Sequence, residues 1–469
     1  MTKTRFSRRD FLRVGSAAAA GTILAACGGA AAPAAKQPTA APAAQPAAEQ
    51  PTAAPAAQPA AAEGVTIQWW VGWGNLTAAI DKIKQTPQFK EMIGKNTLEF
   101  KPSVKAEALL TAIAGGTPPD GASNADYPNL WSRGALTPVD EMISTSSVIK
   151  KDDILPKLWD SAIYDGKMIG VPGLESYLWW GLNYNTDAAT KAGLDPTKAP
   201  ETWDDAMTWH KALTKFDAAG NLKQFGLDPY DAMAGETDFG IQSFGGMNWW
   251  DEQNRKINLN NDAMVQCLGT CAEFIKLVGP DKFAGMRQDQ NLGGWGASYN
   301  AGVQNMIIEG YWHPGETQIQ KPEIAKFNVA GWAPVPASRK GAKIMATGSH
   351  LVVLFKDGKH TPEMYKVAEH MVTDSALDII FKEVGWIFGK NSWLQKVDAN
   401  AYPGLKFYID APSQVTEWII GRRCPIHGFV QTQYQELREK VYRGDMTPKD
   451  AAAEMQTRAD TEWKNQGLK

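Results

Sequence analysis

The stretch YDGKMIGVPGLESYLWWGLNYN, residues 164–185, decides our expectation of the fold. It begins with Asp165-Gly166, a dipeptide typical of tight turns, and continues as an apolar run that Pro172-Gly173 ends. A second apolar and aromatic run starts at Tyr177 and finishes in polar Asn183-Tyr184-Asn185. Two strands separated by Pro-Gly are typical of a chain that leaves one sheet and enters another. Taken alone, the stretch is equally consistent with a buried strand pair whose tryptophans belong to a core.

The composition is that of a globular, mildly acidic chain with an excess of tryptophan. Its 469 residues suffice for two or three domains, and 43% of them are hydrophobic and 21% charged. Beyond residue 26 the chain has 43 basic and 50 acidic residues, which excludes the positive footprint of a nucleic-acid-binding protein. The 18 tryptophans include doublets at 69/70, 179/180 and 249/250 and predict flat aromatic faces presented to a ligand.

Residues 1–27 have the pattern of an export signal. Arg8 and Arg9, within SRRDFL at 7–12, are similar to a twin-arginine motif, and the apolar segment that follows is too short for a permanent membrane span. LAAC at 24–27 is similar to a lipoprotein cleavage box, in which Cys27 would carry lipid and become the mature N-terminus. We therefore expect a chain anchored to the outer face of the bacterial cytoplasmic membrane. The alternative is a plain signal peptide with an incidental cysteine.

Residues 28–64 consist almost entirely of Ala, Pro, Gln and Thr. The segment QPTAAPAAQPAAE at 37–49 recurs at 50–63 with one extra alanine. Such a composition supplies no side chains for a core, so we expect a disordered spacer between the anchor and the folded body.

The folded body is expected to start at Val65 with an alternating strand that ends near Gly72. A helix, a strand at 97–101 and a second helix at 106–114 follow, and Gly115-Gly116 with Pro118-Pro119 ends the latter. This β-α-β-α alternation predicts an α/β fold with a mostly parallel sheet.

Several motifs, in order and spacing, resemble the family 1 extracellular solute-binding proteins of ABC importers, of the maltose-binding, carbohydrate type. The resemblance covers essentially all of 65–469. The matching segments are AIAGGTPPD at 112–120, GALTPVD at 134–140, YDGK at 164–167, NYN at 183–185, AGLDP at 192–196, ETWDD at 201–205, NM at 305–306, YW at 311–312, GWAPVP at 331–336 and the last helix around 447–459.

The resemblance implies the type II periplasmic-binding-protein fold. In that fold two α/β lobes, each a central sheet flanked by helices, are joined by hinge crossings and close on a ligand between them. We place lobe one at 65–172 plus 332–372, and lobe two at 173–331 plus 373–469. The stretch at 164–185 then contains the first hinge strand.

The resemblance also implies where ligand contacts lie. Asn124, Asp126 and Tyr127 follow the 112–120 signature, although Asn and Asp also simply make turns. Glu175 or Tyr177 matches a hinge position that hydrogen-bonds the ligand. Aromatic and imidazole candidates are Trp73, Trp179, Trp249 or Trp250 (one of which we expect in the core), Trp295, Trp312, His350 and Trp386, with His427 or Phe429 as weaker ones.

These residue types suit a sugar. A pyranose has apolar faces that stack on indole and a rim of hydroxyls that donate to Asp, Glu and Asn. Stacking one face removes about 50–100 Å² from water, or roughly 1–3 kcal/mol. We therefore expect capture of a mono- or oligosaccharide and delivery to the permease of an ABC transporter, without catalysis, by a monomer that needs no cofactor, metal or nucleic acid.

Three alternatives remain at this point. The same binding fold can take a polyamine, because aromatic walls with acids also form cation–π cages. It can take a glycerol phosphodiester, although the candidates include no Arg or Lys for a phosphate. A secreted glycoside hydrolase would need two carboxylates flanking the scissile bond, and no pattern marks such a pair.

The cysteines of the body predict buried free thiols. Cys267 and Cys271 are four residues apart on an expected helix, a poor geometry for a disulfide, and Cys424 is distant in the sequence. A disulfide bridge to Cys424 is the alternative. His313 and Glu316 are spaced like metal ligands, but Pro314-Gly315 between them favours a turn.

Overall fold

Strand β1 (Thr66–Val71) is the centre of the first sheet and buries Ile67, Trp69 and Val71 on alternate positions. The computed structural model describes residues 64–174, 176–289, 292, 295–348 and 350–468, which belong to one compact unit. The sheet has five strands in the order β2-β1-β3-β15-β6. β1 runs parallel to β2 (Thr97–Lys101) and β3 (Gly121–Ser123), whereas β15 (Leu351–Leu354) is antiparallel to β3 and to β6 (Val171–Pro172).

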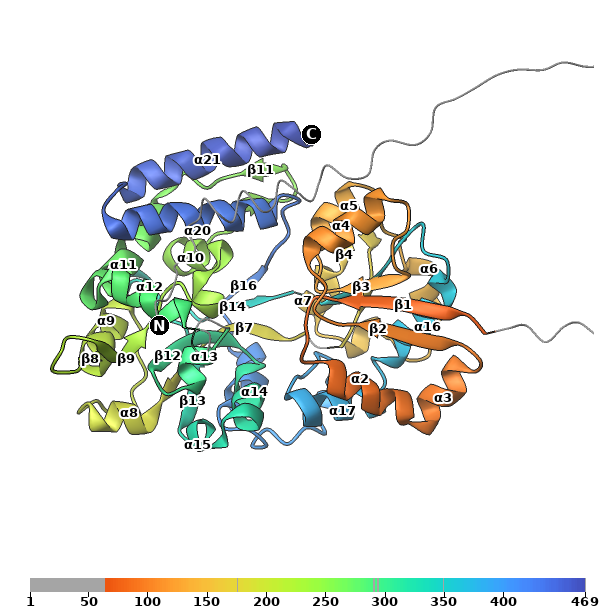
Figure 1. Ribbon diagram of the computed structural model, residues 1–469, viewed down its shortest axis with the longest axis horizontal. Helices are drawn as coiled ribbons and strands as arrows, with labels where there is room; N and C mark the ends of the chain where they lie inside the picture. Colours follow the sequence, from red (N-terminus) through yellow and green to blue (C-terminus); the bar gives the residue numbers. More distant parts are fainter. Residues whose placement is uncertain (1–63, 175, 290–291, 293–294, 349, 469) are drawn as a thin grey trace, which may run out of the picture. The chain divides into compact units, whose positions relative to one another are not determined.

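Helices cover this sheet, as Figure 1 shows for its orange and blue segments. α16 packs against β1, β6 and β15, and α17 packs against α2. The expected β-α-β-α order at the start of the body is therefore confirmed, but the expectation of a mostly parallel sheet is wrong beyond β1, β2 and β3, because β15 pairs antiparallel with both of its neighbours. The helices of this half are α2 (Thr77–Gln85), α3 (Pro87–Ile93), α4 (Ala106–Ala114), α5 (Tyr127–Ser132), α6 (Asp140–Ser144), α7 (Pro156–Ser161), α16 (Thr361–His370) and α17 (Asp374–Val384), with the 3₁₀ turn η1 (Lys151–Asp153) and the ribbon β4 (Ile163–Tyr164) and β5 (Lys167–Met168).

The second sheet has seven strands and is organised around β7 (Leu178–Asn185), all of whose residues are buried. β7 pairs antiparallel with β12 (Gln304–Gly310) on one side, and with β13 (Asn328–Trp332) and β14 (Ile344–Thr347) on the other. The order continues through β9 (Leu222–Leu227) to β8 (Lys215–Phe216) at one edge, and through β14 to β16 (Glu417–Ile420) at the other.

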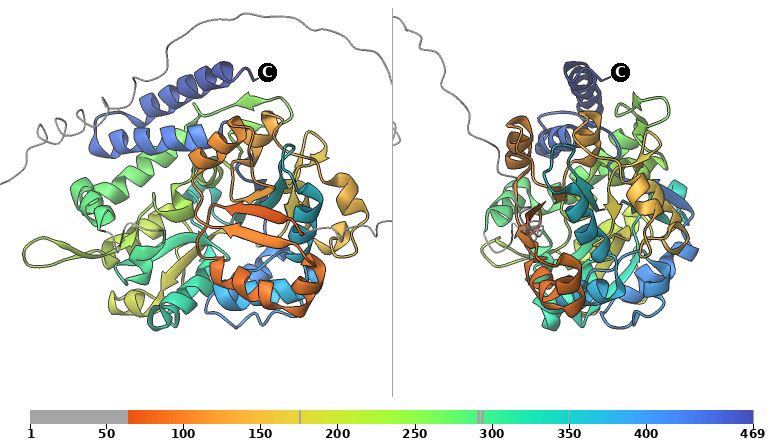
Figure 2. Two further views of the ribbon diagram at one scale, coloured as in Figure 1. Left: turned by 45° about the vertical axis from the view of Figure 1, so that its right-hand side comes forward. Right: turned by 90° about the vertical axis from the view of Figure 1, so that its right-hand side faces the viewer.

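The second half is rich in helices, and the long pair α20 and α21 lies side by side in Figures 1 and 2. α11 packs against α10, α20 and α21. No helix among the described residues is both long and apolar enough to cross a membrane. The helices are α8 (Thr186–Lys191), α9 (Trp203–Leu213), α10 (Thr237–Gly245), α11 (Asp262–Val278), α12 (Pro280–Gln288), α13 (Ala297–Asn300), α14 (His313–Gln320), α15 (Pro322–Ala325), α19 (Leu405–Asp410), α20 (His427–Arg443) and α21 (Pro448–Asn465); η2 (Ala232–Gly235), η3 (Ala337–Arg339), η4 (Ala411–Ser413) and the ribbon β10 (Trp250–Asp251) and β11 (Lys256–Ile257) complete this half. The short helix α18 (Asn391–Leu394) contacts the first half instead, where Trp393 donates to Asp378 of α17 and Ser392 donates to Asp153 of η1.

The chain passes from the first sheet to the second between β6 and β7, and back between β14 and β15. The two connections are hydrogen-bonded to each other. The Thr347 hydroxyl donates to the Tyr177 carbonyl over 2.6 Å, and the His350 amide donates to the Ser176 hydroxyl over 2.6 Å. Ser176 also exchanges backbone hydrogen bonds with Ile387 and Gly389, which follow α17, so this segment of the first half borders the connections as well.

Two segments fall on the other side of the expected lobe borders. We assigned 332–372 to lobe one, but β14 pairs with β7 and β16 in the seven-stranded sheet. We assigned 373–469 to lobe two, but α17 packs against α2 of the first half. β14 and β15 are both short, wholly buried apolar strands, so the sequence does not distinguish the sheet that each one joins.

The tryptophans serve mainly as core residues. Ten of the 18 are buried, and Trp69, Trp180, Trp249 and Trp393 are among the largest fully buried side chains. The composition alone predicted aromatic faces presented to a ligand, and this expectation is wrong for most of them. The excess arises because large indoles fill the space between sheets and helices in a body of this size.

Candidate functional site

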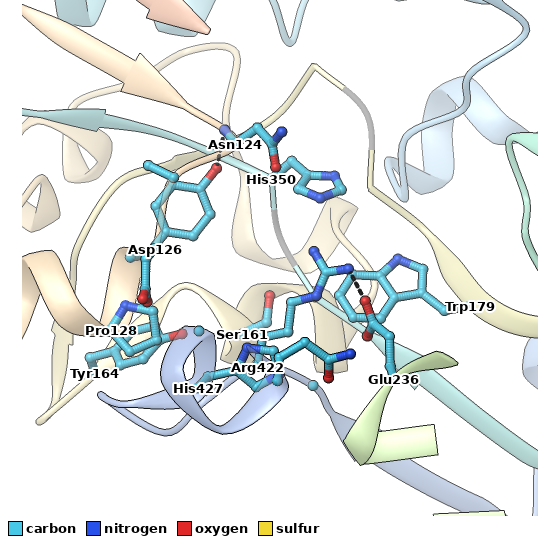
Figure 3. A pocket seen from close by; sticks show the side chains of 16 residues that line it. Asn124, Asp126, Pro128, Ser161, Tyr164, Trp179, Glu236, His350, Arg422 and His427 are labelled. Atoms are coloured by element: carbon cyan, nitrogen blue, oxygen red, sulfur yellow. Dashed lines mark hydrogen bonds and ion pairs between the residues drawn. The ribbon is translucent and has the colours of Figure 1, made fainter. Parts of the chain in front are cut away.

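A cavity of about 330 Å³ lies where the connections between the two sheets meet the loops of both halves. The first half contributes the loop after β3 and the region around α7 and β4, and the second half contributes Glu236 between η2 and α10, the loop after β16 and the start of α20. Figure 3 shows its side chains. It is lined by Asn124, Ala125, Asp126, Tyr127, Pro128, Ser161, Tyr164, Trp179, Glu236, Gly348, His350, Gly421, Arg422, His427, Gly428 and Gln431.

The loop after β3 is held in shape by hydrogen bonds of its own. Asn124 has a φ of 51°, a left-handed conformation that asparagine tolerates, and its amide donates to the Tyr127 hydroxyl over 2.8 Å. That hydroxyl donates to the carbonyl of Leu351 in β15 over 3.1 Å. The Asp126 carboxylate caps α5 by accepting from the Asn129 amide. The loop therefore places polar groups at the carboxyl end of a parallel strand, the usual position for ligand contacts in open α/β sheets.

Trp179 forms the opposite wall, and glycines make room for it. A Cβ atom on Gly348 would come within 2.5 Å of the indole, and one on Gly421 within 2.8 Å. The Arg422 guanidinium lies over the ring, 5.0 Å from its centroid, and the His350 ring packs at 6.2 Å. Trp179 is 3% exposed. A solute therefore meets a small part of this indole rather than a free aromatic face.

Arg422 and Glu236 form an ion pair beside Trp179, as Figure 3 shows. The second carboxylate oxygen of Glu236, Oε2, is buried without a hydrogen-bond partner, and so is the indole Nε1 of Trp179. The Nε2 of His427 is also buried without one and lies 3.8 Å from Asp238. Buried polar atoms without partners are rare in folded proteins, because each costs about 1–3 kcal/mol. All three residues line the cavity, so unused hydrogen-bonding capacity lies next to the space that a solute would enter.

The charges of the cavity favour hydrogen-bond donors over anions. Asp126 is exposed as a residue, but desolvation of its carboxyl within the cavity raises the pKa of that carboxyl above its usual value, although nearby His427 and Arg133 oppose this. Burial alone would lower the pKa of Arg422, but the adjacent Glu236 and Asp238 outweigh it and raise the pKa, so the guanidinium is charged and matched by Glu236. Asp126 has no such cationic partner at ion-pair distance among the described residues.

Five of the sequence candidates line the cavity: Asn124, Asp126, Tyr127, Trp179 and His350. His427, a weaker candidate, lines it as well, and Trp249 stacks behind it with the rings 6.2 Å apart. Trp73 and Trp386 lie one layer further out. Trp73 packs edge-on against His350 at 4.5 Å and against Trp386 at 5.3 Å.

The structure does not bring the other candidates to this cavity. Tyr177 is buried against Tyr311, and Trp250 packs against Trp463. The Trp312 indole donates to buried Glu309, and Trp295 is 54% exposed. The remaining calls, Glu175, Cys27, Arg8 and Arg9, lie outside the described residues.

Sequence reasoning did not single out several lining residues, including Ser161, Tyr164, Glu236, Arg422 and Gln431. One signal was available. In EWIIGRRCP at 417–425 a short apolar strand ends in glycine and two arginines, and charged residues directly after a buried strand are typical of a ligand-binding edge. Tyr164 belongs to the stretch around which we built the fold, but we considered it only as part of the YDGK motif at 164–167.

A larger groove of about 730 Å³ lies elsewhere, on the second half alone. It is bounded by 197–209, 331–333 and 340–343 and includes Trp209 and Trp332. None of the buried polar atoms without partners belongs to its lining. We therefore take the smaller cavity, whose lining includes three residues with such atoms, as the candidate site.

The cysteine expectation is confirmed, since Cys267, Cys271 and Cys424 are free and buried. The residues that resembled a metal pair have structural roles. His313 is buried at the start of α14, where a helix begins instead of the expected turn, and burial lowers its pKa to about 3. The Glu316 carboxylate accepts from the indole of Trp386. No group of metal-binding side chains occurs in the described part of the chain.

The chain belongs to the bacterial extracellular solute-binding protein family, whose sequence profile matches residues 73–377. Membership in this family implies a position outside the cytoplasm and a binding rather than an enzymatic role. No curated protein sequence is significantly similar to the chain.

Solved structures share the two-lobed fold. An ABC transporter solute-binding protein from Thermotoga lettingae, bound to α-D-tagatose, is 19% identical with a TM-score of 0.70, over 85% of this chain and 99% of that one. An ABC substrate-binding protein from Listeria monocytogenes, in complex with cycloalternan, is 17% identical with a TM-score of 0.69, over 87% and 100%. The maltose/maltodextrin-binding domain from Bdellovibrio bacteriovorus, bound to maltotriose, is 17% identical with a TM-score of 0.65, over 85% and 100%. At these identities the likeness shows the fold, which agrees with the prediction from sequence.

Proposed function

We propose that the chain captures a mono- or oligosaccharide in the 330 Å³ cavity and delivers it unchanged to the permease of an ABC transporter. The observation that carries the proposal is that three residues with buried polar atoms without partners, Trp179, Glu236 and His427, line one cavity between the two halves. The hydroxyls of a sugar both donate and accept, so they can satisfy all three. The sugars bound to the structural relatives from Thermotoga lettingae and Bdellovibrio bacteriovorus support the same class of ligand.

The cavity's charges discriminate among the alternatives. A glycerol phosphodiester would need a cation with free hydrogen-bonding capacity, but Arg422 is already paired with Glu236 and covers Trp179. A polyamine is the second candidate, because Asp126 and Glu236 could accept from an ammonium group. Solutes with neutral hydroxyls satisfy the same acceptors without placing a charge in a largely buried space.

A thermal-shift panel tests the proposal. Tagatose, mannobiose and maltotriose would be compared with spermidine and glycerophosphocholine, and hits would be followed by calorimetry. We expect at least one sugar to raise Tm and to be recovered intact after prolonged incubation. A response to spermidine alone would favour the amine candidate, and hydrolysis of the sugar would contradict a purely binding role.

We also propose lobe borders that follow the sheets. Lobe one then comprises about 65–172 and 350–390, and lobe two about 178–347 and 400–469, with the connections between them as hinges. Closure would be a population shift, because a solute contacts groups from both halves only when they are together.

The N-terminal proposal rests on sequence alone. Arg8 and Arg9 direct export by the twin-arginine route, Cys27 carries the lipid, residues 28–64 act as the spacer, and the folded body works as a monomer. Fractionation of cells expressing Cys27→Ser tests the anchor, and light scattering tests the monomer.

A further inference from the structure

Arg423 joins the two halves of the molecule next to the candidate site. It lies in the loop after β16 of the second half and is buried. Its guanidinium donates to two carbonyls of the first half, that of Ser161 over 3.0 Å and that of Ile163 over 2.5 Å. Ser161 is the last residue of α7, where carbonyls have no partner within the helix and the helix dipole favours a cation.

The same guanidinium covers Tyr164, whose ring centroid is 3.6 Å from its Cζ atom. Tyr164 lines the candidate cavity, and on Arg423's side it also borders a second cavity of about 340 Å³. Glu252 of the second half holds the arginine in orientation by accepting from its Nε and Nη2. Arg423 therefore forms one continuous connection from Glu252 through Tyr164 to the end of α7.

The neighbouring residue faces the solute. Arg422 has a φ of 57°, a left-handed conformation that directs consecutive arginines to different places. Arg422 lines the candidate cavity with Trp179 and Glu236, whereas Arg423 lines the second cavity behind Tyr164. The Arg422 amide is fixed by the Asp238 carboxylate over 2.7 Å. A displacement of this loop by the solute would thus act on the interlobe contact one residue away.

We propose that Arg423 helps to fasten the second lobe to the first, beside contacts such as that of Asn129 with Pro425, and that by doing so it positions Tyr164 as a wall of the solute site. This inference rests on the proposed solute-binding function for its effect on affinity, but not for its effect on the contact between the lobes. A planar guanidinium fork can reach two carbonyls and stack on a ring at the same time, whereas a lysine ammonium cannot.

The test is the distance between the lobes in the full-length chain. Nitroxide labels at Gln88→Cys on α3 and Lys211→Cys on α9, both exposed positions, would report it by electron–electron double resonance. The described native cysteines are buried, and the chain without added cysteines provides the labelling background. We expect Arg423→Lys to shift the sugar-free distribution toward longer distances and to weaken binding of maltotriose, or of the best sugar of the panel, at least tenfold.

Arg438 provides a matched control. Its guanidinium also lies over a tyrosine, 4.4 Å from the Tyr230 ring, and donates to two backbone carbonyls, those of Gly235 and Tyr230. All of these partners are in the second half. Arg438→Lys should therefore lower Tm to a similar degree while leaving the distance distribution and the affinity unchanged.

The outcomes separate the two claims. An unchanged distance distribution in Arg423→Lys would overturn the proposal, as would an equal change in Arg438→Lys. If no sugar binds the wild-type chain, the proposed function fails, but the sugar-free distances still decide the role of Arg423. Should Arg423→Lys not fold, Glu252→Gln takes its place, since Glu252 is 45% exposed. It should shift the distances in the same direction by a smaller amount, and no shift would overturn the proposal.

Discussion

Glu236 offers the sharpest single perturbation of the candidate site. One of its carboxylate oxygens pairs with Arg422, and the other is buried in the cavity without a partner. Glu236→Gln keeps the shape of the side chain but removes the charge and replaces one acceptor with a donor. The change therefore separates the electrostatic contribution of this residue from its packing.

The magnitude follows from these contacts. A hydrogen bond to a charged acceptor contributes about 1.5–3 kcal/mol, so the dissociation constant of the sugar should rise by roughly 10- to 150-fold. Loss of the ion pair should lower the free energy of unfolding by only about 1–2 kcal/mol, because a third of the Arg422 side chain is exposed and water screens its charge.

Isothermal titration calorimetry with the best sugar of the panel measures the affinity, and thermal unfolding measures stability. Glu201→Gln is the control, since Glu201 forms an ion pair with Lys340 in which the two side chains are 64% and 60% exposed. It should change the unfolding free energy by less than about 0.5 kcal/mol and leave the affinity unchanged. Sugar affinity within twofold of wild type in Glu236→Gln would refute the assignment of this cavity.

Three further predictions follow from the described contacts. Gly348→Ala should weaken sugar binding at least tenfold and lower the free energy of unfolding by about 1–3 kcal/mol, because the added Cβ would lie within 2.5 Å of Trp179. Gly285→Ala, with open space around it, should do neither, and calorimetry and thermal melts of both variants check this. Asp126→Asn should raise Tm at pH 7.5 and lose that advantage by about pH 3. The reason is that a carboxyl whose pKa is raised in the folded state stabilises the wild-type protein while it is protonated, and this stabilisation is lost as the pH rises. A Tm difference between variant and wild type that stays constant across a pH series would contradict this. Cys27→Ser should move the protein from the membrane fraction to the soluble fraction with unchanged sugar affinity, and continued membrane association would exclude the lipid anchor.

Local signals in the sequence were sufficient for the first elements of the α/β body, whereas the two-lobed arrangement was predicted from the resemblance to a known family. The alternating strand at 66–71, the glycine and proline stops after the helix at 106–114, and the Pro-Gly break before β7 each mark an element boundary. The borders between the two lobes in the later part of the chain are not marked by such local signals. β14 and β15 have the same wholly buried pattern, and only their partners, β7 and β3, place them in different sheets.

The site residues that could be predicted are those that lie next to the ends of strands. Asn124, Asp126, Tyr127, Trp179 and His350 all follow strand ends or connections and line the cavity. The aromatic argument failed because a tryptophan in a glycine-rich segment can equally fill a core. The glycines at 348 and 421 admit the Trp179 ring rather than expose it. Glu236, Arg422 and Tyr164 converge only through tertiary contacts, which no spacing in the sequence shows.

A crystal structure of the chain with the sugar that raises its Tm most would test the central claim directly. We predict density for the sugar within the cavity between the two sheets, with hydroxyls hydrogen-bonded to Glu236 Oε2 and Trp179 Nε1. Density in the Trp209–Trp332 groove instead, or a sugar that leaves these two atoms without partners, would contradict the account.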